Sequence, residues 1–301
     1  MPIPGGCAYN TSIAIGNLFK NTNFQVGFLG RISNNFFGDI QVQKLREYNV
    51  KENFLIRGEE NPILAIIKTE EGKEPQYAFY HEGAIDRLLS HNELNSVLEK
   101  NSDIDISCVV FGSVCMTMEP IASTIESFIT VKSAEKKVIA FDPNIRPFFI
   151  KDREAFLTRF KKWAGLCTIA KISGEDFEFI FPDAKPETAL EKMIDLGTRL
   201  AIVTLGSSGT AALLRRGDNT VIKTSVPGVK IPNTGDTVGA GDTFLGAFLA
   251  HLELRGKLSP NMIVNLSETE LRDALSFANK AAAIVCTRYG AQPPALGEIE
   301  D

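Results

Sequence analysis

The chain has 301 residues, of which 44% are hydrophobic and 23% are charged. These values are typical of a globular protein with one large domain or two small ones, and they allow a large buried core. The formal net charge of −5 argues against a nucleic-acid binder, because binding a duplex requires a basic face. The richest apolar run, residues 104–118, is interrupted by Asp105, so no stretch reaches membrane-spanning length.

Cysteine usage and the first residues indicate a cytoplasmic protein. The opening Met-Pro-Ile-Pro-Gly-Gly has neither the basic region nor the apolar region of a secretory signal. The cysteines are scattered and odd in number, and no pair has the spacing of metal ligands. We therefore expect reduced core thiols. The five cysteines are Cys7, Cys108, Cys115, Cys167 and Cys286.

The first elements predicted along the chain are those of parallel βα units. Helices are expected over residues 8–20 and 36–48, and a buried strand over residues 24–30. The pattern then changes to a hairpin, in which β-rich runs at 63–68 and 77–80 flank a polar turn at 70–73. This hairpin is either a surface insertion or part of a lid over a cleft.

Alternation of strands and helices returns at about residue 103. This order predicts an α/β fold, a mostly parallel sheet with helices on both faces and a small β insertion. Ligands of such sheets bind at the carboxyl ends of the strands. Strands are expected over 108–111, 138–141, 167–171 and 201–205, helices over 121–131, 156–163, 175–180, 187–196 and 268–286, and an antiparallel pair over 211–214 and 220–224.

The most informative stretch runs from Gly235 to Phe244 and reads GDTVGAGDTF. The apolar residues that follow fit a helix packed on one face, with residues 239–241 as its first turn. First turns carry unpaired N–H groups and positive dipole density, and glycines let an anion approach that backbone. Asp242 is then either an N-terminal cap of this helix or a base beside a bound phosphate.

Three further polar loops follow predicted strands. Residues 142–147 form either a capped turn or, through Arg146, a loop that recognises phosphate. Ser173 and Asp176 are spaced as a helix cap. Residues 204–209 form a tight turn or a loop that contacts a nucleotide. The sequence contains no P-loop, no dinucleotide fingerprint after a strand, no nucleophile elbow and no zinc-protease motif.

Residues 236–244 resemble the C-terminal signature of the ribokinase (pfkB) family of carbohydrate kinases. Other motifs resemble those of the family in the same order along nearly the whole chain. The segments 79–84 and 142–147 look most like those of bacterial fructokinases and 2-keto-3-deoxygluconate kinases. The other matching motifs are Gly5-Gly6-x-x-x-Asn10, Asp142-Pro-Asn144-x-Arg146-Pro, Lys171-x-Ser173-x-x-Asp176, Thr204-x-Gly206 and Ala278-Asn279-Lys280.

This resemblance implies a ribokinase-like fold and an ATP-dependent sugar kinase. Fructokinase is the expected activity, and 2-keto-3-deoxygluconate kinase or another pfkB sugar kinase is the alternative. Asp242 is implied as the catalytic base, and Arg146 as a phosphate ligand. The backbone of Gly239, Ala240, Gly241 and Asp242 is implied as the anion hole. ATP is the implied co-substrate and Mg²⁺ the implied metal, with a monovalent cation such as K⁺ as a further candidate.

The resemblance also assigns residues to the sugar end and the nucleotide end of the site, and to a lid. Residues 1–301 are expected to form one kinase domain, in which residues 62–82, with part of the N-terminal segment, close over the sugar as a small β lid. The exposed edge of that lid offers a contact for a homodimer. Asp176 is implied to reach the metal through water. The implied sugar residues are Gly5, Gly6, Asn10 and Asn144, and the implied nucleotide residues are Lys171, Ser173, Thr204, Gly206, Ser207, Gly209 and Asn279.

The sequence departs from the family pattern in three places. Family members begin with a strand that bears Gly-Glu and a sugar-binding Asp, and we expect this strand to be missing here. Ser33 and Asn35 stand where Gly and Asp are frequent, and Ser173-x-x-Asp176 stands for Asn-x-x-Glu. The expected loss of the strand and the residues at 33 and 35 motivate an alternative of another class, an inactive truncated relative that only binds sugar or nucleotide.

Overall fold

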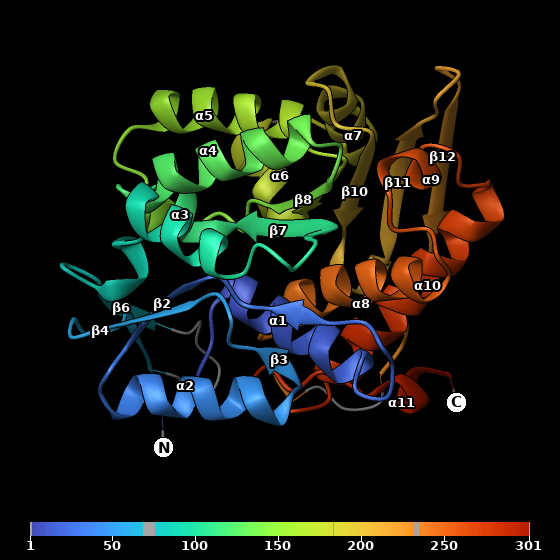
Figure 1. The fold of residues 1–301 in the computed structure, drawn as a ribbon. Coiled ribbons are helices and arrows are strands. Elements are labelled where there is room, and N and C mark those ends of the chain that lie inside the picture. Colours follow the sequence, from blue (N-terminus) through green and yellow to red (C-terminus); the bar gives the residue numbers. More distant parts are fainter. Residues whose placement is uncertain (1, 69–75, 183, 232–234, 301) are drawn as a thin grey trace.

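The computed structural model describes residues 2–68, 76–182, 184–231 and 235–300, and a six-stranded sheet forms its centre (Figure 1). The strand order is β12-β11-β10-β9-β8-β7. The strands from β7 to β10 run parallel, whereas β11 is antiparallel to both of its neighbours. Their bounds are β7 (Cys108–Gly112), β8 (Val138–Asp142), β9 (Ile169–Ser173), β10 (Leu200–Thr204), β11 (Thr210–Arg215) and β12 (Val221–Val226).

Helices cover both faces of this sheet because its strands are apolar on both sides. Val138 and Ala140 of β8 pack on the layer that contains α1, α8 and α10. The alternate residues Ile139 and Phe141 pack on the layer that contains α4, α5 and α7. These helices are α1 (Cys7–Leu18), α8 (Ala240–Leu254), α10 (Glu268–Val285), α4 (Ile121–Ala134), α5 (Arg153–Leu166) and α7 (Pro186–Asp195).

Three two-stranded sheets lie beside the central sheet, in the part of the chain between α1 and α3. The pairs β1·β3 and β2·β4 are parallel, and β5·β6 is an antiparallel hairpin. The bounds are β1 (Val26–Gly27), β2 (Gly30–Ser33), β3 (Val50–Lys51), β4 (Leu55–Gly58), β5 (Leu64–Lys68) and β6 (Gln76–Tyr80). The remaining helices are α2 (Phe36–Glu47), α3 (His91–Lys100), α6 (Gly174–Ile180), α9 (Pro260–Ile263) and α11 (Leu296–Glu300).

The α/β class, the hairpin and the antiparallel pair that the sequence predicts are confirmed. The single strand expected over residues 24–30 is wrong, because this run divides between β1 and β2, which join different sheets. The polar turn at 70–73 lies outside the described residues. Within the described part of the chain, β7 lies at an edge of the sheet and pairs with β8.

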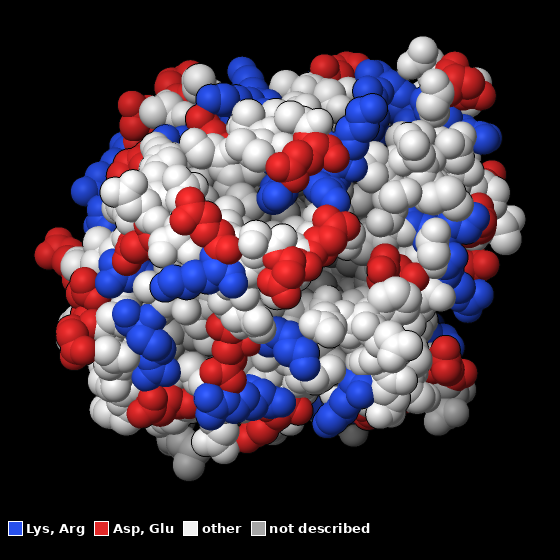
Figure 2. Space-filling view, in the orientation of Figure 1, with Lys and Arg blue, Asp and Glu red and all other residues white. Residues whose placement is uncertain are grey.

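Charges of both signs are interspersed on the face shown in Figure 2, with no extended basic area. Within the described ranges, none of the helices is both long enough and apolar enough to cross a bilayer.

Candidate active site

The first turn of α8 presents unpaired backbone N–H groups, as first turns of helices do. Gly239 precedes the helix at φ 78°, a left-handed conformation that favours glycine, and a Cβ there would lie 2.6 Å from Cβ of Ala291. The N–H groups of Gly241 and Asp242 have no acceptor among the described residues. The N–H of Ala240 donates to the carbonyl oxygen of Thr237 at 3.2 Å, and the part expected of Ala240 in an anion hole stays a prediction.

Asp242 is buried and is oriented by two side-chain amides. Nδ2 of Asn10 in α1 donates to Oδ2 of Asp242 at 2.7 Å. Nδ2 of Asn144, in the loop after β8, donates to Oδ1 at 3.3 Å. No side chain caps α8 at its N-cap residue, so the interpretation of Asp242 as the helix cap is wrong. The carboxylate instead faces the N-terminus of α1.

Burial raises the pKa of Asp242 above the ordinary aspartate value, and the hydrogen bond from Asn10 opposes this rise. The resemblance implies Asp242 as the base, which must be deprotonated to act, so kcat/KM is expected to fall as the pH drops through this raised pKa. Replacing Asn10 by alanine removes the opposing contact. The acid limb of the profile is expected to move to higher pH.

The measurement is the pH dependence of kcat/KM in the wild type, in Asn10→Ala and in Asn265→Ala, which removes an exposed amide far along the chain. The control is expected to keep the wild-type limb. An unchanged acid limb in Asn10→Ala would show that the ionisation seen in the pH dependence of kcat/KM is not that of Asp242.

A buried ion pair lies beneath the first turn of α8. Nζ of Lys171 in β9 lies 2.9 Å from Oδ2 of Asp142 in β8, and both side chains are buried. Burial alone would lower the pKa of Lys171, but the carboxylates of Asp142 and Asp176 outweigh it and raise that pKa. Burial raises the pKa of Asp142 to about 6, so both partners are charged at neutral pH.

This position gives Lys171 a structural role, and the nucleotide-binding role expected of it stays a prediction. A Cβ on Gly241 would lie 2.8 Å from Nζ of Lys171, so the ammonium sits directly under the first turn of α8. The other oxygen of Asp142 accepts from the backbone N–H of Asn144 at 3.2 Å, where Asn144 has φ 38°. Lys171 and Asp142 therefore hold the loop that carries Asn144 to Asp242.

Cys7 is a neighbour of Asp242 that the sequence pattern does not single out. Its Sγ lies 4.0 Å from Oδ2 of Asp142, and burial raises the pKa of the thiol well above its ordinary value. The thiol is thus protonated and faces the two aspartates rather than the hydrophobic core. No spacing rule for cysteines could have placed it there, because the contact depends on how α1 docks against the sheet.

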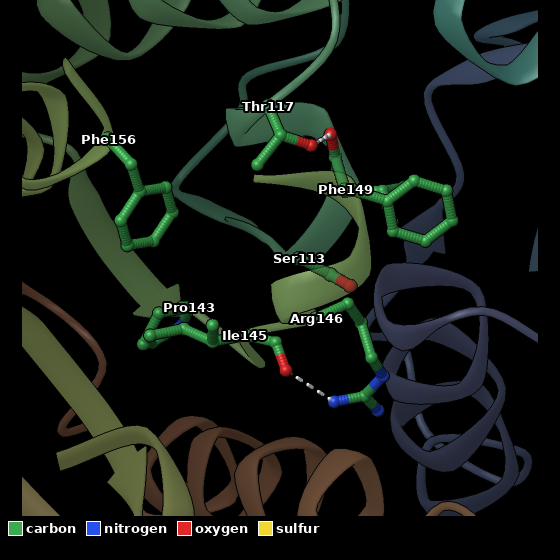
Figure 3. Close-up of a pocket in the computed structure, with 8 residues that line it drawn as sticks. Ser113, Thr117, Pro143, Ile145, Arg146, Phe149 and Phe156 are labelled. Atoms are coloured by element: carbon green, nitrogen blue, oxygen red, sulfur yellow. Dashed lines mark hydrogen bonds between the residues drawn. The ribbon is translucent and has the colours of Figure 1, made fainter. Parts of the chain in front are cut away.

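Arg146 is exposed beside the base. Its Nη1 donates to the carbonyl oxygen of Ile145 at 3.0 Å (Figure 3). In that view the guanidinium points away from Phe156 and the apolar wall of a small pocket. Its positive charge lowers the pKa of Asp242. The rest of the guanidinium is therefore available to an anion that enters between α1 and α8.

Ser173 and Asp176 form the helix cap that their spacing predicts. Oγ of Ser173 accepts from the N–H of Asp176 at 3.0 Å, and Oδ2 of Asp176 accepts from the N–H of Ser173 at 3.0 Å. Oδ1 of Asp176 accepts from the N–H of Ile145 at 2.7 Å. Because both oxygens bind backbone N–H groups, the carboxylate has a structural role, and the metal contact through water expected from the sequence stays a prediction.

In the loop after β10, some residues line the cavity and others serve the structure of the turn. Thr204, Gly206 and Ser208 of this predicted loop line the cavity described below. Gly209 has φ 100°, and a Cβ there would lie 2.2 Å from the carbonyl oxygen of Val226, so Gly209 serves a tight turn. Ser207 is exposed and lies outside the cavity lining.

Asn279 does not reach the cavity either. Its Oδ1 accepts from Oγ1 of Thr210 at 2.7 Å, and its Nδ2 donates to the carbonyl oxygen of Pro227 at 3.1 Å. Both the oxygen and the nitrogen of the amide thus bind protein groups, and the nucleotide contact expected of this residue stays a prediction. Asn35 is committed in a similar way, because its Oδ1 accepts from the N–H groups of Phe37 and Gly38 and caps α2.

One cavity of about 1990 Å³ joins the two ends of the predicted site. It places the expected sugar residues, the base and the expected nucleotide loop around a common space. The predicted residues that line it are Gly5, Gly6, Asn10, Asn144, Arg146, Lys171, Ser173, Asp176, Thr204, Gly206, Gly239, Ala240, Gly241 and Asp242.

Fold and site together define an ATP-dependent kinase of the ribokinase-like α/β class. The structure of a fructokinase from Xylella fastidiosa with bound ATP superimposes with a TM-score of 0.84 at 21% identity, covering 100% of this chain and 92% of that chain. The chain belongs to the pfkB family of carbohydrate kinases, whose family model matches residues 3–296.

The curated relatives include fructokinases of bacteria and plants. A fructokinase of Rhizobium leguminosarum bv. trifolii is 30% identical over 272 residues, which cover 90% of this chain and 78% of the relative. Fructokinase-1 of Oryza sativa subsp. japonica is 27% identical over 299 residues, which cover 99% of this chain and 86% of the relative. The family and the kinase class expected from the sequence are thus confirmed.

Proposed function

We propose that this kinase phosphorylates fructose, with Asp242 as the catalytic base. The observation that carries the proposal is the orientation of the buried Asp242 carboxylate by Asn10 and Asn144 beside the anion-binding turn of α8. Similarity to curated fructokinases, one of them 30% identical, supports fructose as the sugar. A Vibrio cholerae fructokinase with bound fructose and ADP has a similar fold, with a TM-score of 0.82.

The residues support in-line phosphoryl transfer. Asp242 accepts the proton of a sugar hydroxyl, and the hydroxyl oxygen forms a bond to the γ-phosphorus of ATP. The bond from that phosphorus to the bridging oxygen breaks, and ADP leaves. The N–H groups of Gly241 and Asp242, with Arg146, stabilise the charge on the transferring oxygens. Mg²⁺ bound to the nucleotide would neutralise its phosphates, and no protein ligand for it is assigned here.

The β5·β6 hairpin is proposed to act as the lid. Ile63, Leu64 and Phe79 line the cavity. The ring of Phe79 lies 5.3 Å from the ring of Phe148 and 5.2 Å from that of Phe149, in the segment that follows Arg146. The hairpin thus packs on the loop of the active site, where it can exclude water from the reaction. A homodimer contact through this hairpin stays a prediction.

Turnover with different sugars tests the proposal. The purified chain is expected to release ADP from ATP with fructose at a higher kcat/KM than with ribose or 2-keto-3-deoxygluconate. ATP hydrolysis without sugar supplies the background. A preference for 2-keto-3-deoxygluconate would overturn the choice of sugar. Nucleotide binding without turnover of any sugar would favour the inactive relative.

A further inference from the structure

Three side chains that can bind a metal ion converge between α1 and α8. They come from separate elements: Cys7 is the first residue of α1, Asp142 ends β8, and Asp242 lies in the first turn of α8. Sγ of Cys7 and one oxygen of each carboxylate all lie within 4.8 Å of one another. Within the described ranges, no other three cysteine, histidine or acidic side chains converge in this way. The phosphoryl transfer proposed above uses Asp242 but not the thiol.

The spacing of these atoms is close to that of a tetrahedral zinc site. With Zn–S bonds of about 2.3 Å and Zn–O bonds of about 2.1 Å, the ligand atoms of such a site lie about 3.5 Å apart. Sγ of Cys7 lies 4.0 Å from Oδ2 of Asp142, so a small inward movement suffices. Cys7 and Asp242 also line the large cavity. An ion from solvent can therefore reach the cluster.

The two carboxylates are already oriented in the way that metal ligands are. Nζ of Lys171 lies 2.9 Å from Oδ2 of Asp142. The amides of Asn10 and Asn144 donate to the two oxygens of Asp242. Hydrogen bonds of this kind fix ligating groups in proteins, and a carboxylate oxygen that accepts one of them keeps a lone pair for a metal.

The amide of Asn10 supplies an independent sign of a ligand. Asn10 is only 6% exposed, and its Oδ1 is a buried acceptor without a hydrogen-bond partner. Oδ1 lies about 2.3 Å from Nδ2 of the same amide, and Nδ2 lies 2.7 Å from Oδ2 of Asp242, which puts Oδ1 within about 5 Å of the cluster. Buried acceptors without a donor are rare. A water that binds the metal as its fourth ligand would supply the donor.

The buried charges around the cluster favour a cation. Asp142, Asp176 and Asp242 are buried, and Lys171 is the buried cation beside them. Arg146 also acts on Asp242 but is exposed to water. A divalent ion that displaces the thiol proton brings two positive charges and releases one, so the excess of negative charge falls.

A thiolate with two carboxylates selects zinc over the magnesium of the nucleotide, because Mg²⁺ prefers oxygen ligands in octahedral geometry. We propose that Cys7, Asp142 and Asp242 bind one Zn²⁺ ion, which inhibits the kinase. The thiol gives its proton to the solvent as the Zn–S bond forms. The binding of the ion does not depend on the proposed function, whereas the inhibition rests on Asp242 as the base.

The test of the site uses the full chain without nucleotide or sugar, in a phosphine reductant that does not bind metals. Zn²⁺ binding is measured by calorimetry, and Co²⁺ serves as a coloured probe whose bond to a thiolate gives a charge-transfer band in the ultraviolet. The variant is Cys7→Ser. The matched control is Cys115→Ser, because Sγ of Cys115 donates to the carbonyl oxygen of Gly112 at 3.0 Å and a serine hydroxyl keeps that donor.

The wild type and Cys115→Ser are expected to bind one ion per chain and to show the charge-transfer band. Cys7→Ser is expected to lose the band and to bind Zn²⁺ at least about a hundredfold more weakly, since loss of an outer contact alone costs about 10–100-fold. Absence of the band in the wild type, or an equal band in Cys7→Ser, would overturn the site.

A second variant, Asp242→Asn, keeps the thiol and removes one carboxylate ligand. It is expected to weaken Zn²⁺ binding by about tenfold or more, and its melting temperature shows whether the chain is still folded. Unchanged Zn²⁺ affinity in folded Asp242→Asn would overturn the proposed ligand set.

Inhibition is measured as turnover with fructose and excess Mg²⁺·ATP, at free Zn²⁺ concentrations fixed by a metal buffer. Free Zn²⁺ at ten times its Kd is expected to lower kcat/KM for fructose about tenfold in the wild type, and chelation is expected to restore it. Cys7→Ser is expected to be insensitive at the same concentration. Unchanged turnover of the Zn²⁺-bound wild type would overturn both the inhibition and the role of Asp242 as the base, but not the metal site.

Discussion

Replacing Asp242 by asparagine is expected to lower kcat by roughly 10²–10⁴-fold, the size of general-base assistance, while the nucleotide still binds. Asparagine has nearly the same shape but cannot accept the proton of the sugar hydroxyl. The neutral side chain also removes the cost of a buried carboxylate, so the protein is expected to remain folded. The measurement is steady-state turnover together with calorimetric titration of ATP.

The matched control is Asp105→Asn, which removes an exposed carboxylate from a surface ion pair with Lys137. This variant is expected to keep wild-type turnover and nucleotide affinity. If Asp242→Asn retained near wild-type kcat, Asp242 would not be the base. If it lost nucleotide binding as well, its main role would lie in shaping the first turn of α8.

Replacing Lys171 by methionine is expected to destabilise the fold by roughly 3–5 kcal/mol, because the carboxylate of Asp142 is then buried without its partner. The free energy of unfolding in urea measures this loss. Lys137→Met is the control, since its pair with Asp105 lies at the surface and is worth less than about 1 kcal/mol.

The double variant Lys171→Met/Asp142→Leu separates stability from activity. It is expected to recover much of the lost stability, since it leaves no unpaired buried charge. Its activity is expected to stay low, because the N–H of Asn144 loses the Asp142 oxygen that holds it. Full activity in the double variant would show that the ion pair does not position Asn144.

Much of the fold follows from local patterns in the sequence. The apolar strands and the helices between them predict the layers, and GAG before an apolar run predicts the start of α8. The two-residue strands β1 and β3 are too short to carry a pattern of their own. Their pairing depends on where α1 and α2 dock, and that information is not local.

In the candidate site too, some features follow from local sequence patterns and others depend on how distant elements pack. Residues at strand ends, such as Asn144 and Thr204, could be placed near one another because parallel strands end at one edge of a sheet. The pairing of Lys171 with Asp142 depends on how β8 and β9 lie side by side. The bond of Asn279 to Thr210 depends on how α10 lies beside β11. Residue types and spacing do not contain these relations.

The contact between Asn10 and Asp242 joins residues that are 232 positions apart. On a ribosome, α1 is made long before α8, so the base is not oriented until most of the chain has emerged. During that time, the apolar face that α1 buries against α8 is exposed. A chain that is stopped before α8 is therefore expected to aggregate and to require a chaperone.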